Sequence, residues 1–232
     1  MGETIRKTAA REDILADLKK SHDNATAKGG MATTLADQKL LPILKIADGT
    51  QAQKTAAQAI ADPLIAALSM ADINADKAIG KTSDDVWNDI GRPAADAGFD
   101  LLFPGGNAFY VDGAVEDQPD KMDLLVELLK LNVHPKLSAA VAQACITTIT
   151  AESTTLRSAV DAARPARAKL ALFDRVLTAV ARSAAIEIGN FKRLLKANGF
   201  SEAEIHTIIP DRTPAAPKAP PGPPAPPNNN PT

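Results

Sequence analysis

Residues 136–199 read KLSAAVAQACITTITAESTTLRSAVDAARPARAKLALFDRVLTAVARSAAIEIGNFKRLLKANG, and this stretch decides the fold class. Apolar side chains recur in it every three or four residues, which is the repeat of a helix with one buried face. Pro165 interrupts the pattern because proline lacks the amide hydrogen that a helix interior uses. We predict two long helices that meet at Arg164-Pro165, either as an antiparallel hairpin, which we expect, or as one bent rod.

Glycine and proline divide the rest of the chain into shorter helical stretches. We expect an all-α protein, an elongated multi-helix bundle that ends in the long C-terminal hairpin. Residues 1–210 form a single α-helical domain in this interpretation, with a subdivision near residues 104–119 as the alternative. Only Ala108–Val111 has strand character, and we expect a structured loop there. The other expected helices cover residues 3–27, 33–48, 50–80, 83–90, 93–102, 120–133 and 201–209.

The last segment of the chain has a different composition. From Thr213 it reads TPAAPKAPPGPPAPPNNNPT, which contains no large apolar residue. Such a segment cannot bury enough surface to offset the entropy lost on ordering it. We predict that residues 211–232 form a disordered, proline-rich tail that is either a spacer or a ligand for a partner protein.

Charge and cysteine content limit the classes of function. The chain carries 26 Lys and Arg against 28 Asp and Glu, so its formal charge of -2 gives no reason to expect nucleic acid as a partner. Its single cysteine, Cys145, lies in an apolar run and cannot form an intramolecular disulfide. We find neither a signal peptide nor an uncharged apolar run of eighteen residues. We therefore expect no transmembrane segment and a cytoplasmic location.

One segment has unusual local chemistry, the run WNDIGRPAADAGFDLLFPGGNAFYVDG over residues 87–113. It holds five of the eight aromatic residues in the chain, together with five glycines. In one interpretation the aromatic side chains form a small satellite core that closes one end of the bundle. In the other they anchor a partner. The predicted partner-binding residues are Trp87, Phe103, Phe109 and Tyr110, rimmed by Asp84 and Asp85.

No sequence motif for catalysis is present. Carboxylate-bridged metal sites in helical bundles use Glu-x-x-His pairs, and none of the three histidines has Glu three residues before it. Gly80-Lys81-Thr82 supplies only the end of a phosphate-binding loop. Glu152 and Glu187 fall on or beside apolar stripes and are the only metal candidates that we single out. We predict no catalytic residues and no cofactor.

These observations favour a non-enzymatic helical structural or protein–protein interaction protein. Long apolar stripes and alanine-rich faces suit close helix pairing, so we expect a homo-oligomer and protein partners. Coating of a membrane or granule surface remains open as a role for such helices. The alternative is a metal- or ligand-binding helical bundle, even an enzyme, that uses acidic residues of the core and of the central loop.

Overall fold

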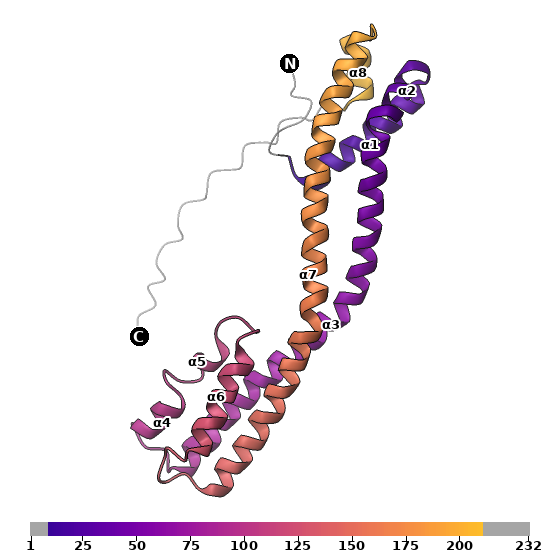
Figure 1. Cartoon of the computed structure of the whole chain (residues 1–232). Helices are drawn as coiled ribbons and strands as arrows, with labels where there is room; N and C mark the ends of the chain where they lie inside the picture. Colours follow the sequence, from indigo (N-terminus) through magenta and orange to yellow (C-terminus); the bar gives the residue numbers. More distant parts are fainter. Residues whose placement is uncertain (1–8, 211–232) are drawn as a thin grey trace, which may run out of the picture. The chain divides into compact units, whose positions relative to one another are not determined.

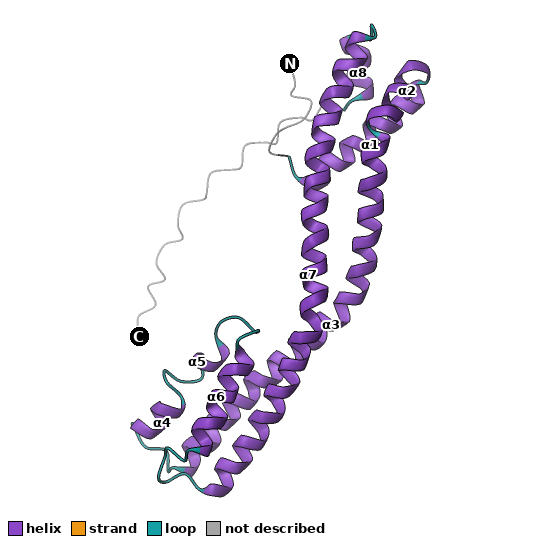
Figure 2. Ribbon diagram, viewed as in Figure 1, coloured by secondary structure: helices purple, strands orange, loops and turns teal. Residues whose placement is uncertain are grey.

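The computed structural model describes residues 9–210, and within that range the chain is all-α. Helices account for 82% of it, and no strand occurs among the described residues (Figure 2). The predicted fold class is therefore confirmed, while the predicted tail lies outside the described residues. The helices are α1 (Arg11–Lys28), α2 (Gly30–Lys39), α3 (Leu41–Asp89), α4 (Ala97–Leu102), α5 (Ala108–Val111), α6 (Gln118–Lys130), α7 (Ala139–Ala197) and α8 (Glu202–Ile208).

Internal contacts divide the chain into two compact units. Of the described residues, the first unit contains 9–48 and 177–210, and the second contains 49–176. The helices α3 and α7 each contribute residues to both units. The segment 104–119, which the sequence marked for a subdivision, lies inside the second unit.

The expected hairpin at Arg164-Pro165 does not form, because α7 continues through Pro165 as one helix of 59 residues. Proline costs about 3 kcal/mol inside a helix. Buried stripes elsewhere on the same helix offset that cost: Val160 and Ala163 are buried just before the proline, and burial resumes at Leu177, twelve residues after it. The proline ring itself is exposed, so water can solvate the carbonyl group that it leaves without a partner.

The second long helix, α3, covers a stretch for which the sequence predicted several shorter helices. It runs through Gly49 and Gly80, where the sequence predicted breaks, and also through Pro63. The real break lies earlier, at Leu40, and Pro42 occupies the first turn of α3, where proline is tolerated. A helical glycine costs about 1 kcal/mol, which is less than the packing of the apolar face contributes.

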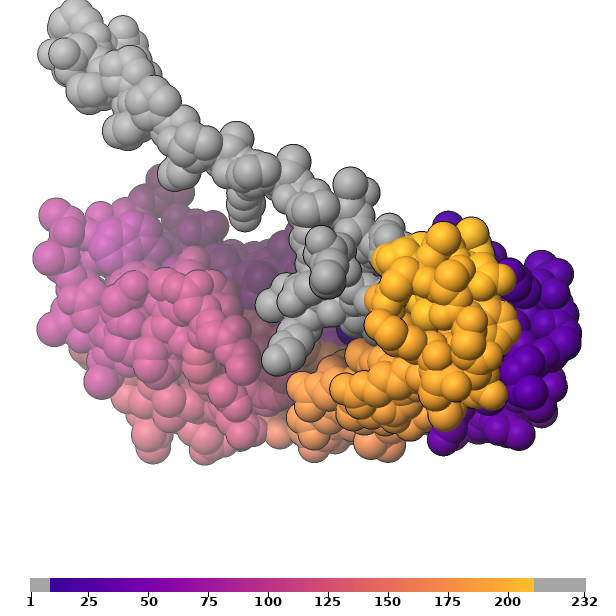
Figure 3. Space-filling model, turned by 90° about the horizontal axis from the view of Figure 1, so that it is seen from above, coloured from indigo at the N-terminus to yellow at the C-terminus, as the bar shows by residue number. Residues whose placement is uncertain are grey.

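The first unit packs α1, α2 and α8 with the first turns of α3 and the end of α7. Its core includes Leu18, Leu40, Phe191 and Ile205, all fully buried. Figure 1 shows α8 near α1 and α2, and in Figure 3 the yellow surface of α8 lies next to their indigo surface. A capping box begins α8: Ser201 Oγ accepts a hydrogen bond from the amide of Glu204, and the Glu204 carboxylate accepts one from the amide of Ser201.

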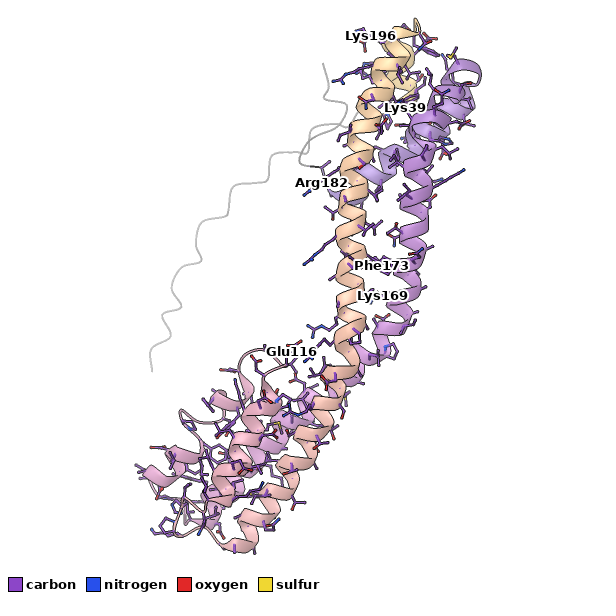
Figure 4. The ribbon with its side chains drawn as sticks, viewed as in Figure 1. Lys39, Glu116, Lys169, Phe173, Arg182 and Lys196 are labelled. Carbon is purple, nitrogen blue, oxygen red and sulfur yellow. The ribbon has the colours of Figure 1, made fainter. Side chains whose placement is uncertain are left out.

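The second unit packs α6 against the second part of α3 and the first part of α7. The apolar face of α6 is mostly buried, through Met122, Leu125, Val126 and Leu129. Arg157 on α7 holds α6 from outside, since its two terminal nitrogens lie 2.9 Å and 2.7 Å from carboxylate oxygens of Asp120 and Asp123. Glu116, labelled in Figure 4, pairs in the same way with Arg167.

Ala108–Val111 differs from both sequence interpretations, because it forms the single helical turn α5. Its strand character came from Phe109, Tyr110 and Val111, which are β-formers by propensity alone. No neighbouring strand exists among the described residues to pair with this segment. Burial of Tyr110 fixes the local conformation instead.

Candidate interaction site at the aromatic cluster

The five aromatic residues between Trp87 and Tyr110 form one continuous group, which we call the aromatic cluster. Trp87 belongs to α3 and Phe99 to α4, and Phe103 directly follows α4. Phe109 and Tyr110 belong to α5. Neighbouring ring centroids lie 4.7 Å (Trp87–Phe99), 5.1 Å (Phe99–Phe103), 5.8 Å (Phe103–Tyr110) and 4.9 Å (Phe109–Tyr110) apart. The sequence-based grouping of these residues therefore holds in space.

Local backbone features place these rings. Asp96 caps α4, because its carboxylate accepts a hydrogen bond of 2.9 Å from the amide of Phe99. After α4 the chain reverses at Gly105 and Gly106, whose φ angles of 76° and 82° favour glycine. The reversal sets α5 beside α4, so that Tyr110 meets Phe103.

The inner half of the cluster is core. Phe103 and Tyr110 are fully buried, and the Tyr110 hydroxyl donates a hydrogen bond of 2.5 Å to the carbonyl oxygen of Leu102. Burial raises the pKa of Tyr110 to about 12, so the phenol stays neutral at physiological pH. These two residues are placed to stabilise the second unit rather than to meet a partner directly.

The outer half of the cluster is accessible. Phe109 is 40% exposed, and Leu101 beside the cluster on α4 is also exposed. The Lys121 ammonium lies 5.9 Å from the centroid of the Phe109 ring, and it donates to the carbonyl oxygen of Asp112. Trp87 is half-buried and packs against the core. Of the predicted anchors, Phe109 is therefore the one with a large exposed face.

The two predicted acidic residues differ in their surroundings. Asp84 is exposed, whereas Asp85 is half-buried and pairs with Lys81 one turn earlier on α3. A shallow open hollow is lined by Asp85, Asn88 and Asp89 of α3 and by Val141 and Ala144 of α7. Asp89 also accepts hydrogen bonds from the amide and the hydroxyl of Ser138 at the start of α7. Asp85 and Asp89 thus border a hollow that none of the five aromatic side chains lines.

His134 is the important residue that the sequence reasoning missed. It is 2% exposed, and its Nε2 atom lies 3.0 Å from Oδ1 of Asp96. Its Nδ1 atom accepts a hydrogen bond from the amide of Lys136. These bonds tie the loop before α7 to the cap of α4. No local motif in the sequence marks this role. The one feature that could have indicated a close neighbour is Gly98, which packs against the His134 ring.

The two metal candidates belong to different units. Glu152 belongs to the second unit and Glu187 to the first. No group of three or more His, Cys, Asp or Glu that could hold a metal occurs among the described residues. Glu187 accepts a hydrogen bond of 3.2 Å from the Asn190 amide, but its Oε2 atom is buried without a hydrogen-bond partner. Cys145 is buried, and burial raises the pKa of its thiol, as expected for a packing residue.

Comparison of the chain with protein-family models, curated proteins and solved structures finds no match.

Within residues 9–210, α3 is the one helix that passes a length and composition test for a membrane span. Its most apolar window of 18 residues has a mean hydropathy of 1.3, and 22% of that window is buried. A single helix that passes this test is weak evidence for a membrane span, and none is assigned to α3.

Proposed function

We propose that this chain is a non-enzymatic, cytoplasmic helical structural or interaction protein that self-associates and binds protein partners. One observation carries the proposal, namely the large apolar side chains that remain exposed along the helices of the second unit. Met70 and Ile73, three residues apart on α3, are 59% and 42% exposed. Exposed apolar residues that gather in patches mark interaction surfaces on soluble proteins.

The aromatic cluster is the proposed docking point for a different protein. Phe109 and Leu101 offer apolar contact, while Asp100 and Asp112 beside them are exposed carboxylates. Their surroundings are acidic, since residues 49–176 contain 12 Lys and Arg against 17 Asp and Glu. A partner segment with an apolar anchor and neighbouring basic side chains fits this chemistry.

Native mass spectrometry of the protein, isolated gently from its own cells, tests this proposal. The expected spectrum contains a homo-oligomer, or a co-purifying protein at integral stoichiometry. A monomer that retains no other protein at any accessible concentration contradicts the proposal. Repeating the isolation with Phe109→Ala locates the docking point, since this variant should lose the co-purifying protein and keep the homo-oligomer.

A metal- or ligand-binding bundle, even an enzyme, is the second candidate, and Glu187 supports it. A buried carboxylate oxygen without a partner is costly, and a bound cation or donor group removes that cost. Elemental analysis of the purified chain tests this candidate. Stoichiometric metal that is lost in Glu187→Gln, but retained in Glu152→Gln, favours it, and a metal-free protein without bound small molecules removes it.

A further inference from the structure

The face of α3 that points away from the core of the second unit is apolar and regular. Residues Ala59, Pro63, Ala66, Met70, Ile73 and Lys77 follow one another at alternating spacings of four and three, and all six are exposed. We call them the outer seam. The buried stripe of α3, with Ala61, Leu68 and Ala75, lies on the opposite side of the helix.

The spacing of the outer seam is that of a helix-packing surface. Alternating steps of three and four residues give the 3.5-residue repeat by which two helices pack side by side. Between Asp62 and Asp72 the sequence PLIAALSMA has no charge on any face of the helix. A helix that is apolar on all sides is normally covered on all sides. Here Met70 and Ile73 remain 59% and 42% exposed.

Charges at the two ends of the seam indicate what covers it. Asp62 and Lys77 are both exposed on this side of α3, and neither forms an ion pair within the described chain. They are separated by 15 residues, or about 22 Å along a helix, so they cannot meet within one copy. Two helices that pack antiparallel bring the end of one seam to the beginning of the other.

We infer that the outer seam binds the outer seam of a second copy in antiparallel orientation. This inference rests on the proposed self-association and names its surface. In the register that sets Lys77 opposite Ala59 of the second copy, Met70 lies opposite Ala66, and Ile73 lies opposite Pro63. Asp62 of the second copy is then only three residues, or about 4.5 Å along the helix, from the point that Lys77 faces. Large side chains then face small ones in successive layers, which is the condition for close packing. A parallel arrangement would instead place Lys77 against Lys77.

A lipid surface is a poorer match for the same face. The second unit has a formal charge of -5, from 12 Lys and Arg against 17 Asp and Glu, and this charge is repelled by anionic lipid headgroups. Helices that lie on membranes have basic residues along their polar face. The charges that flank PLIAALSMA are instead the carboxylates of the exposed Asp62 and the half-buried Asp72.

Sedimentation equilibrium of the full chain tests this inference with matched variants. Met70→Glu combined with Ile73→Glu puts charge in the middle of the seam and should weaken self-association at least about tenfold. The control is Leu124→Glu combined with Leu131→Glu, which adds the same charge at exposed positions on and after α6 and should change the dissociation constant less than about threefold. Circular dichroism of each variant shows whether the helices are retained.

A charge exchange tests the orientation. Lys77→Glu alone should weaken self-association about threefold to tenfold, and adding Asp62→Lys should restore it, because the pair is re-formed across the interface.

If the wild type associates but the seam variants associate equally well, the inference is wrong and the proposed function survives. A wild type that is monomeric and partner-free overturns both. Flotation with neutral phosphatidylcholine vesicles tests the lipid alternative. If the wild type floats but does not self-associate in solution, and only the seam variants lose flotation, the seam binds lipid and the inference is overturned.

Discussion

The imidazole of His134 donates from Nε2 to Oδ1 of Asp96 across 3.0 Å, and this contact joins the start of α4 to the loop that leads into α7. The proton lies on Nε2 because Nδ1 accepts from the amide of Lys136. Asp96 uses the same oxygen to cap α4 through the amide of Phe99. These two hydrogen bonds lower the pKa of Asp96 below its usual value of 3.8, and the bond from the Phe99 amide has the larger effect.

Removal of this contact should destabilise the aromatic cluster. We expect His134→Ala to lower the free energy of unfolding by about 2 kcal/mol, because the substitution leaves a cavity and removes a donor from a capping carboxylate. Denaturant unfolding followed by the fluorescence of Trp87, the only tryptophan, measures the change next to the cluster. The exposed His206 is the control, and His206→Ala should cost less than about 0.5 kcal/mol. Equal effects of the two substitutions would refute the anchoring role of His134.

Gly98→Ala should be destabilising for a steric reason. A Cβ atom at this position would lie 2.6 Å from Cδ2 of His134, closer than carbon atoms can approach. The buried ring cannot easily withdraw, so we expect a cost of about 1–3 kcal/mol. The control is Gly49→Ala in α3, where a Cβ atom meets nothing within 4 Å and where alanine should stabilise the helix by about 0.5–1 kcal/mol. Thermal unfolding of both variants shows whether the two shifts have opposite signs.

The buried phenol of Tyr110 should make the folded protein less stable at high pH. It is the only tyrosine in the chain, so tyrosinate absorbance reports on this residue alone. Its folded pKa of about 12 lies above the unfolded value of 10.0. The neutral phenol therefore stabilises the fold fully below pH 10, and this contribution is lost as the pH rises toward 12. A titration midpoint near 10 in the folded protein would contradict the buried position of Tyr110.

The two halves of the aromatic cluster should respond differently to truncation. Phe103→Ala removes a buried ring and should cost about 3–5 kcal/mol in unfolding free energy. Phe109→Ala removes a ring that is 40% exposed, so it should cost about 1 kcal/mol and should chiefly weaken the binding of a partner. Unfolding measurements on both variants, with partner capture for Phe109→Ala, separate core packing from docking. A large loss of stability in Phe109→Ala would place that ring in the core.

Local signals in the sequence predicted some boundaries well. Gly199 ends α7 with a φ of 85°, Ser201 and Glu204 cap α8, and Pro119 lies in the first turn of α6. Those features act through backbone geometry within a few residues. Pro165 and Gly80 failed as helix breaks because their cost is small beside the packing of a long apolar stripe. Such packing depends on distant residues, which no local pattern reveals.

The candidate site was predictable in the same partial way. Composition alone located the aromatic residues in one segment, and their rings do form one chain of contacts. The division between the buried Tyr110 and the exposed Phe109 required the turn at Gly105 and Gly106. The Asp96–His134 hydrogen bond joins residues 38 positions apart. No motif near His134 in the sequence indicates that it has such a partner.

The central claim is that the chain associates with itself, and its mass in solution tests that claim most directly. Light scattering of the full chain across a dilution series should give a mass that rises with concentration from the 24.3 kDa of one copy toward twice that value. A mass that stays at 24.3 kDa at every concentration would contradict the account.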